Sequence, residues 1–482
     1  MVLQEERYVM VNWMCMCLVA LPAMLATSAV AKDSPPNFVV IFTDDQGYAD
    51  VGCYGAKDIK TPRLDQMAKE GVRFTNFYAQ TVCGPSRAAL MTGCYPLRVA
   101  TEKNRVTVHP FLHQDEVTIA EVLKEVGYRT AAFGKWDLAG HSQTGYSPKL
   151  LPKFQGFDYF FGTPTSNDAR VHLLRNTQVI ERDADMSLLT KRYTDEAISF
   201  IKRSKDKPFF VYVAHTMPHI RLEVSDAFKG KSAGGIYGDV IEELDWNVGR
   251  ILDAVKAEGL DDNTYVIFTS DNGPWYLGRS KGHLKRLGKD AEKHGGLADP
   301  LRGAKTSVWE GGLRVPCIVR APGRVPAGTV NHEIACTMDL LPTLAKIAGG
   351  QAPEDRVIDG DDISDLIHGV EGARSKKKAF YYYQQTRLQA VRSGRWKLHL
   401  PGPRHWPEYS KAEDAIEIHE NQLYDLENDL GETTNVAKAN PEVVRTLMKL
   451  VEEARADIGD YNRVGKGARF FDAGPRRPDV KR

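Results

Sequence analysis

The chain has 482 residues, of which 42% are hydrophobic and 26% are charged. This composition is typical of a globular protein with a sizeable core, and it argues against an intrinsically disordered chain. Lysine and arginine number 64 against 63 aspartates and glutamates, which gives a formal net charge of +1. Because nucleic-acid-binding proteins usually carry a basic excess, we expect no nucleic-acid partner.

An apolar segment lies near the N-terminus, at residues 13–26, and is followed by Ala29-Val30-Ala31. The segment is too short to span a membrane comfortably, and the two alanines match the cleavage pattern of a signal peptide. We therefore predict a signal peptide over residues 1–31, export to the periplasm or the extracellular space, and no stable membrane insertion. The alternative is an apolar N-terminal helix that stays attached.

Seven cysteines are spread along the chain, and two of them, Cys15 and Cys17, lie inside the predicted signal peptide. An odd number of cysteines in the remaining, exported part indicates one thiol with a special role. Their sparse spacing does not form a disulfide framework, and the sequence has no Cys-x-x-Cys pair of the kind that binds zinc. The remaining cysteines are Cys53, Cys83, Cys94, Cys317 and Cys336.

Two segments far apart in the sequence end in the same way. Residues 38–42 form an apolar run typical of a buried strand, and residues 265–270 form a second one. In an open α/β sheet, ligands bind at the carboxyl ends of the strands. Any single polar residue there is explained as a strand-ending turn, but the set together indicates a binding site. These polar residues are Asp44, Asp45, Asp271 and Asn272.

Two further apolar runs, at residues 128–134 and 209–214, are also predicted to be buried strands. They lead into polar residues in the same way, so we expect these residues at the same edge of the sheet. The residues concerned are Lys135, Asp137, His215 and His219.

Helical periodicity alternates with these strands, at residues 118–126, 193–202 and 240–256. The alternation predicts an α/β fold with a large, mostly parallel sheet sandwiched by helices. After residue 372 the pattern changes to short β-like runs and a helix that starts near Asn440 and Pro441. We therefore predict an α/β domain over residues 32–372 and a smaller C-terminal domain, an antiparallel sheet plus a helix, over residues 373–482.

Cys83 stands just before a predicted helix, because Pro85 is well placed in the first helical turn. Backbone N–H groups and the helix dipole favour an anion there, either a thiolate or a bound tetrahedral oxyanion. Arg87, one turn further, can add a charge-assisted hydrogen bond to that anion. From these residues alone, a buried structural cysteine is an equal alternative.

The strand-end residues Asp44, Asp45, Asp271 and Asn272 supply three carboxylates and an amide oxygen. Calcium and magnesium prefer such oxygen ligands, and three acids packed together would repel one another without a cation. Positive or proton-transferring groups suited to an oxyanion substrate would surround the site. These are Arg87, Lys135, His219 and Lys305.

The motifs of this chain resemble those of the type I, formylglycine-dependent sulfatases, the arylsulfatase A-like group of the alkaline phosphatase superfamily. The segment "CGPSR" matches the Cys-x-Pro-x-Arg core of that family. The segments "FTDDQGYADVGCYG", "TPRLDQMAKEGVRFTNFYA", "SRAALMTG", "FTSDNG", "LRGAKTSVWEGGLRVP" and "LYDLENDLGETTN" continue the match in the expected order. The resemblance covers nearly all of the mature chain.

The resemblance implies that a maturation enzyme oxidises Cys83 to formylglycine, whose hydrate is a geminal diol. One hydroxyl would attack the sulfur of a sulfate ester, and the second would later expel sulfate as the aldehyde re-forms. By similarity, Arg87 would steady residue 83, Lys135 and Lys305 would grip sulfate oxygens, and His219 would protonate the leaving oxygen. A calcium ion would be held by Asp44, Asp45, Asp271, Asn272 and the modified residue 83.

One position departs from the family pattern. The family usually has Gly-Lys-Trp-His-Leu-Gly, whereas this chain has "GKWDLAG", which places Asp137 where a histidine is expected. An ionised aspartate cannot donate a hydrogen bond and adds negative charge beside an anionic substrate. We hypothesise that Asp137 accepts a proton from the diol or pairs with a nearby lysine, or that His141 or His215 takes the place of the missing histidine.

The leading hypothesis is an exported sulfatase that acts on a sulfated carbohydrate. The basic segment at residues 277–300, which follows Asn272 closely, is a candidate for recognition of an acidic sugar, although a solvated loop explains it equally well. One alternative is a phosphonate or phosphodiester hydrolase on the same scaffold. Another is a catalytically impaired relative that only binds anions or glycans, against which the intact "CGPSR" argues.

Overall fold

The structure is a computed structural model, and it describes residues 34–99, 112–141, 145–168, 170–403 and 407–469. The predicted signal peptide lies outside these ranges. Residues 35–482 group into one compact unit. Among the described residues, we find no helix whose length and hydropathy would let it span a bilayer.

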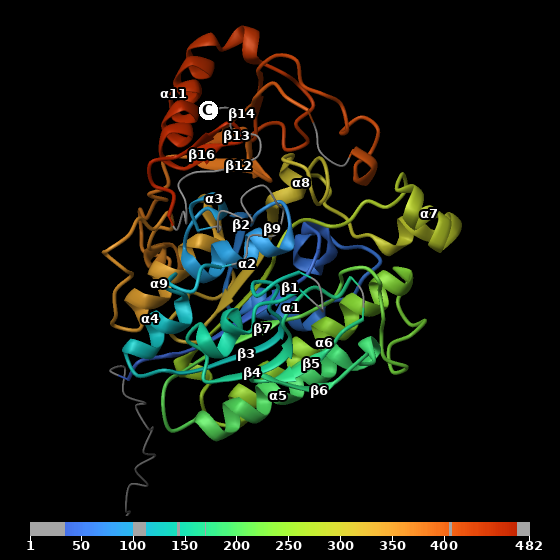
Figure 1. Cartoon of the computed structure of the whole chain (residues 1–482), viewed down its shortest axis with the longest axis vertical. Helices are drawn as coiled ribbons and strands as arrows, with labels where there is room; N and C mark the ends of the chain where they lie inside the picture. Colours follow the sequence, from blue (N-terminus) through green and yellow to red (C-terminus); the bar gives the residue numbers. More distant parts are fainter. Residues whose placement is uncertain (1–33, 100–111, 142–144, 169, 404–406, 470–482) are drawn as a thin grey trace, which may run out of the picture. The chain divides into compact units, whose positions relative to one another are not determined.

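A mixed sheet, eleven-stranded when counted over the described residues, forms the centre of this unit (Figure 1). Its middle is parallel, as predicted, because each run of buried apolar residues is followed by a helical crossover. The order there is β8 (Thr264–Ser270), β1 (Asn37–Thr43), β7 (Phe209–Ala214), β3 (Arg129–Lys135) and β4 (Tyr159–Thr163).

The edges of the large sheet differ from its middle. Strand β9 pairs antiparallel with both β8 and β2, and the short strands β5 and β6 form an antiparallel edge on the other side. The edge strands are β9 (Arg314–Arg320), β2 (Val72–Tyr78), β10 (Thr329–Asn331), β11 (Ala335–Cys336), β5 (Leu173–Arg175) and β6 (Gln178–Glu181).

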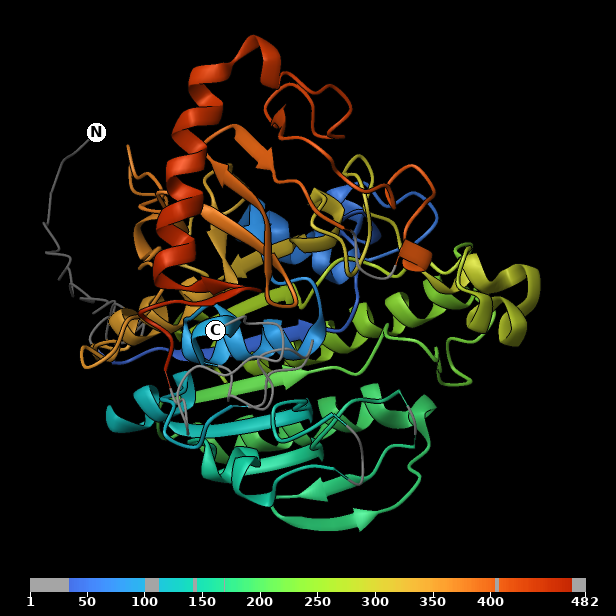
Figure 2. The ribbon, with the colours of Figure 1, turned by 45° about the horizontal axis from the view of Figure 1, so that its top comes forward.

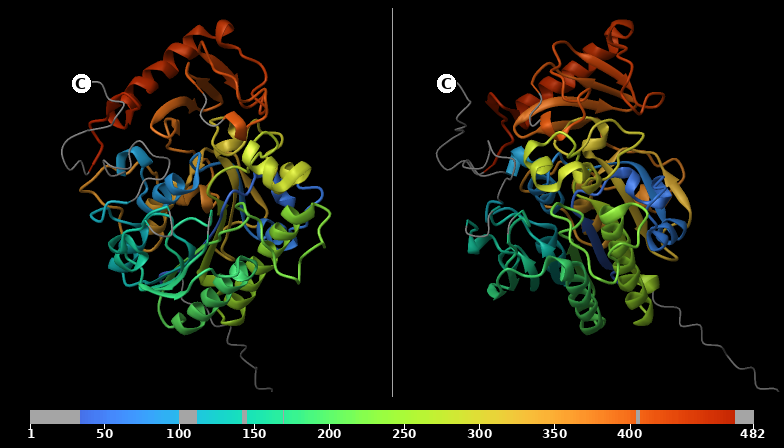
Figure 3. Two further views of the ribbon diagram at one scale, coloured as in Figure 1. Left: turned by 45° about the vertical axis from the view of Figure 1, so that its right-hand side comes forward. Right: turned by 90° about the vertical axis from the view of Figure 1, so that its right-hand side faces the viewer.

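Both faces of the large sheet are covered by helices. Alternate residues of β1 point to opposite faces, so that Val39 packs in one hydrophobic cluster and Val40 in the other. On the Val39 face lie α1 (Pro62–Lys69), α5 (Leu189–Ser204) and α6 (Gly235–Ala257), of which α5 and α6 lie side by side (Figure 3). On the Val40 face lie α2 (Cys83–Thr92), α4 (Ile119–Glu125) and α9 (Leu340–Ile347).

The predicted helices are confirmed with small shifts at their ends. Helix α4 starts one residue after Thr118 because Thr118 is its N-cap: the Glu121 N–H donates to the Thr118 hydroxyl, and the Thr118 N–H donates to the Glu121 carboxylate. Shorter helices connect the main elements: α3 (Pro96–Val99), α7 (Lys281–Leu287), α8 (Glu310–Leu313) and α10 (Ser364–Ile367).

A second, antiparallel sheet follows near the C-terminus, as predicted, and α11 lies along it (Figure 2). Its side chains share a hydrophobic cluster with residues of β2 and α2, so the two sheets belong to one compact unit. The predicted domain boundary at residue 372 lies inside this one unit and stays a prediction. The elements are β12 (Phe380–Gln384), β13 (Arg387–Ser393), β14 (Trp396–His399), β15 (Gln422–Asp425), α11 (Pro441–Asp457) and the hairpin β16 (Gly459–Asp460) and β17 (Arg463–Val464).

Candidate active site

Polar side chains from separate strands meet at the carboxyl edge of the large sheet. The parallel register pairs Thr43 of β1 with Ser270 of β8, which places Asp44 and Asp45 beside Asp271. The Asp45 backbone N–H donates a hydrogen bond of 2.9 Å to the Asp271 carboxylate. The two similar strand ends in the sequence therefore form one cluster.

This cluster has the chemistry of a cation site. Ligand atoms of Asp44, Asp45, Cys83 and Asp271 all lie within 4.8 Å of one another, and these side chains are buried. The amide nitrogen of Asn272 donates to Asp45 Oδ1 at 2.7 Å, while Asn272 Oδ1 and Asp45 Oδ2 are buried with no hydrogen-bond donor among the described residues. Unsatisfied oxygens beside three carboxylates fit a divalent cation such as calcium.

The electrostatics of the cluster point the same way. Burial raises the pKa of Asp44, but Lys135, His219 and Arg87 outweigh burial and hold this pKa far below its usual range. Burial and the neighbouring Asp44 raise the pKa of Asp271 well above its usual range. Two carboxylates this close do not both ionise readily unless further positive charge is added, which a bound cation supplies.

Cys83 is the first residue of α2, and its thiol points into the carboxylate cluster. The thiol donates to Asp44 Oδ1 at 3.1 Å, and Lys305 Nζ donates to its sulfur at 3.1 Å. Burial and Asp44 raise the pKa of the Cys83 thiol well above its usual range, against the opposing effect of the two nearby lysines. The unmodified side chain is therefore a neutral thiol rather than a thiolate nucleophile.

Arg87 lies one helical turn after Cys83 and ties α2 to the strand ends. Its guanidinium donates to Asp271 Oδ2 at 3.0 Å and to the Lys135 carbonyl oxygen at 2.7 Å. The side chain is fully buried. Arg87 thus fixes the start of α2, and with it residue 83, against β3 and β8.

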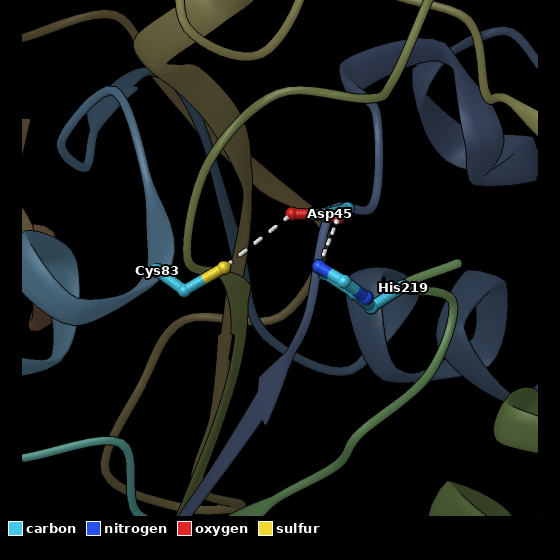
Figure 4. A group of neighbouring side chains, drawn as sticks. All are labelled: Asp45, Cys83 and His219. Carbon is cyan, nitrogen blue, oxygen red and sulfur yellow. Dashed lines mark hydrogen bonds and ion pairs between the residues drawn. The ribbon is translucent and has the colours of Figure 1, made fainter. Parts of the chain in front are cut away.

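Two lysines and a histidine complete the cluster. Lys135 Nζ is 2.7 Å from Asp44 Oδ2, and Lys305 Nζ forms an ion pair with Asp45 Oδ1. Burial lowers the pKa of both lysines, but the carboxylates outweigh it and raise both pKa values, so both ammonium groups stay charged. His219 Nε2 lies 3.6 Å from Asp45 Oδ2, on the same cluster as Cys83 (Figure 4).

Asp137 lies two residues after β3 and is fully buried. Its Oδ1 is 2.9 Å from His141 Nδ1, so the aspartate contacts a histidine four residues further along the chain. His215, by contrast, is buried, and burial lowers its pKa to about 3. His215 is therefore neutral at physiological pH, which makes it a poor replacement for the missing histidine, whereas His141 is directly bonded to Asp137.

Asp168 is a residue that the sequence analysis missed. It follows β4 and contacts both histidines: its Oδ2 is 3.0 Å from His141 Nε2, and its Oδ1 is 3.4 Å from His219 Nε2. The signal was present, because residues 159–163 form another buried run that ends in polar residues. The same rule that identified Asp44 would have identified Asp168.

Trp275 is a second neighbour of the cluster. Its ring centroid lies 6.2 Å from that of His219, and Lys305 Nζ lies 4.5 Å from the Trp275 centroid. Tyr409 and His283 of α7 pack on the same indole. The basic segment at residues 277–300 therefore lies beside the site in space as well as in sequence.

The fold and site define an α/β enzyme with a buried cationic and carboxylate centre that suits a tetrahedral oxyanion. A family model for sulfatases matches residues 36–350, and a model for the C-terminal region of aryl-sulfatase matches residues 375–470. The chain therefore belongs to the sulfatase family, within the alkaline phosphatase superfamily, and is a sulfuric ester hydrolase.

Relatives and a solved structure agree with this family. Human arylsulfatase A is 36% identical over 89% of both chains, and mouse steryl-sulfatase is 34% identical over 79% of this chain and 74% of its own. A solved sulfatase, described in work on the metabolism of multiple glycosaminoglycans by Bacteroides thetaiotaomicron, superposes with a TM-score of 0.75 at 29% identity. The superposition covers 88% of this chain and 99% of that one.

Proposed function

We propose that this sulfatase is exported and hydrolyses a sulfate ester of a carbohydrate, with formylglycine derived from Cys83 and with a calcium ion. The observation that carries the proposal is the Cys83 side chain. It is a neutral, buried thiol that contacts Asp44 and Lys305 at a helix start. A thiol in this state is a poor nucleophile, which favours a chemically modified residue 83.

The hydrated aldehyde would supply the hydroxyl nucleophile for attack on sulfur. The positions of Lys135 and Lys305 on either side of the carboxylates suit them to bind sulfate oxygens, because both ammonium groups stay charged. His219, whose Nε2 lies 3.6 Å from Asp45 Oδ2, is placed to donate a proton to the leaving oxygen. Arg87 keeps residue 83 in place through Asp271.

A calcium ion fits the oxygen atoms present. Asp44, Asp45, Asp271 and Asn272 would hold it, together with residue 83. When bound, calcium would add positive charge that stabilises sulfate in the transition state.

Two observations support a carbohydrate substrate. The structural neighbour described above comes from work on the metabolism of glycosaminoglycans, which are sulfated sugars. The basic segment at residues 277–300 carries exposed Lys281, Lys285 and Arg286 on α7 (Figure 1), which suits an acidic polymer. Export, which the apolar segment at residues 13–26 supports, would bring the enzyme to such polymers.

The test is mass spectrometry of the peptide that contains residue 83, after expression in a host with formylglycine maturation, together with release of sulfate from sulfated sugars. We expect an aldehyde in place of the thiol and release of sulfate. Cys53→Ala serves as a matched control at a half-buried cysteine outside the site. Sulfate release by protein whose residue 83 is entirely unmodified would refute the proposed nucleophile, and a preference for phosphate diesters or phosphonates would refute the substrate class.

A further inference from the structure

Among the described residues around the Asp44, Asp45, Cys83 and Asp271 cluster, side-chain exposure differs sharply. The side chains of His219 and Lys305 are 3% and 4% exposed, whereas those of His141 and Asp168 are 35% and 50% exposed. Asp168 also touches His219 directly, at 3.4 Å. Asp168 and His141 therefore offer polar groups to the alcohol part of a substrate whose sulfate lies in the buried cluster, while the partly exposed Trp275 borders the cluster on the side of Lys305.

Hydrogen bonds from neighbouring residues fix the positions of His141 and Asp168. The buried Asp137 contacts Nδ1 of His141, and Asp168 contacts Nε2 of the same ring. Ser166 donates a further hydrogen bond to Asp168 Oδ2 at 2.7 Å. The His141 imidazole thus lies between the carboxylates of Asp137 and Asp168. Asp168 also contacts His219, the proposed acid.

The geometry sets the charge of His141. Each of its ring nitrogens faces a carboxylate oxygen at 3.0 Å or less, and a carboxylate can only accept. Both nitrogens must therefore carry hydrogen, which makes the ring an imidazolium. Burial lowers the pKa of His141, but Asp137 and Asp168 outweigh it and raise this pKa to about 9.

Asp168 keeps acceptor capacity for a ligand. Burial raises its pKa, but His219 and His141 outweigh burial and hold the pKa well below its usual range, so the side chain is an ionised, half-exposed carboxylate. Hydroxyl groups satisfy such a group, whereas a sterol or an unsubstituted aryl ring would strip water from it without replacing the hydrogen bonds.

We propose that Asp168 and His141, fixed by Asp137, form the subsite for the alcohol part of the substrate, and that this alcohol is a sugar with a hydroxyl group next to its sulfated carbon. The inference rests on the proposed function, because it takes His219 as the donor to the leaving oxygen. Asp168 accepts from the neighbouring hydroxyl, and the His141 imidazolium orients Asp168. Asp137 is then a positioning residue for His141.

The experiment compares kcat and KM for three probes: N-acetylgalactosamine 4-sulfate, which has a free hydroxyl on C3 next to the sulfated carbon, para-nitrophenyl sulfate, and a steryl sulfate. The wild-type enzyme should have its highest kcat/KM on a sulfated sugar. Asp168→Asn and His141→Gln should lower kcat/KM for that sugar by about 10- to 100-fold, and change it for the aryl sulfate by less than about threefold. Asp137→Asn should lower kcat/KM for the sugar selectively, as His141→Gln does, but by a smaller factor.

Controls separate the possible outcomes. Glu371→Gln removes an exposed carboxylate on the turn between α10 and β12, so it should leave kcat/KM unchanged for both the sugar sulfate and the aryl sulfate. The unfolding temperature of each variant shows whether it is folded. Equal losses on sugar and aryl sulfates would overturn the inference, because Asp168 would then serve the chemistry of His219. Higher wild-type kcat/KM on the steryl sulfate would overturn it as well. Absence of sulfate release from every probe would instead refute the proposed function.

Discussion

Two buried charge clusters in this chain contain similar residues and differ in how well their polar atoms are satisfied. One is the catalytic cluster at the ends of β1 and β8. The other lies between the two sheets, where Glu310 accepts from Tyr78 at 2.6 Å, from Tyr382 at 2.7 Å and from Lys397 at 2.9 Å. Glu432 there accepts from Lys397, and its other oxygen from the Glu310 N–H.

Every carboxylate oxygen of the second cluster, the Glu310 cluster, therefore has a donor. In the proposed catalytic cluster, Asn272 Oδ1 and Asp45 Oδ2 have no hydrogen-bond donor among the described residues, and this, rather than the raised pKa values of Asp271 and Glu432, separates the two clusters. A buried network that satisfies itself stabilises the fold, whereas one that does not is prepared for a ligand. Composition alone does not separate the two cases.

The largest effect should come from Cys83→Ala. Loss of the nucleophile should reduce kcat for sulfate release by about 10⁴-fold or more. The unfolding temperature should change little, because the catalytic cluster is not built for stability. Turnover is measured with the matured wild type, Cys83→Ala and Cys53→Ala in parallel. A Cys83→Ala enzyme with near wild-type turnover would contradict the assignment.

Glu310→Ala should lower the stability of the fold and leave turnover unchanged, the reverse of Cys83→Ala. Among the described residues, removing this carboxylate leaves Lys397 with Glu432 as its remaining ion-pair partner and removes the acceptor that Tyr78 and Tyr382 share. We expect a loss of about 3 to 5 kcal/mol in the free energy of unfolding, measured by urea denaturation. Turnover per folded molecule should be kept, and a selective loss of turnover without loss of stability would break the contrast between the clusters.

Asp271→Asn should act mainly on cation binding. The amide keeps one acceptor oxygen for Arg87 or the Asp45 N–H but removes a carboxylate from the proposed ligand set, so calcium-dependent stability should fall more than metal-free stability. Wild-type protein should gain about 2.7 kcal/mol at calcium concentrations 100 times Kd, and the variant should lose most of that gain. Thermal unfolding with chelator and with added calcium measures both. A large calcium-induced stabilisation retained in the variant would remove Asp271 from the ligand set.

The smallest effect concerns His141. Its pKa is raised to about 9 in the folded protein, above the ordinary value of 6.5. The resulting stabilisation is therefore complete below about pH 6.5 and is lost as pH rises through about 9. We expect a shallow fall of the unfolding temperature over this window, and His141→Gln should flatten it. An unchanged slope in the variant would show that other groups cause it.

Much of this architecture follows from local patterns. The buried runs that became β1, β3, β7 and β8 were identifiable because apolar residues there leave no polar face, and the polar residues after them follow from the rule for strand ends. The antiparallel insertion of β9 between β8 and β2 was not predicted, because periodicity carries no information about which strands pair.

The residues that the sequence analysis proposed for the site do lie together in the fold, whereas their catalytic roles stay a prediction. The resemblance to sulfatases marks Asp137 as unusual, yet only the fold shows that it contacts His141 and that Asp168 joins His141 to His219. These contacts depend on how loops after β3 and β4 return to the same edge of the sheet. Burial, which decides the protonation of Cys83, is likewise a property of the assembled chain.

The burial of Cys83 also constrains the order of events in the life of the protein. Cys83 is 2% exposed, and Asp44 and Lys305, which contact its side chain, lie far apart in the sequence. An enzyme that oxidises this residue needs to reach it as part of an extended segment. If Cys83 is oxidised as proposed, the oxidation has to occur before the chain folds, and a molecule that folds first keeps the thiol.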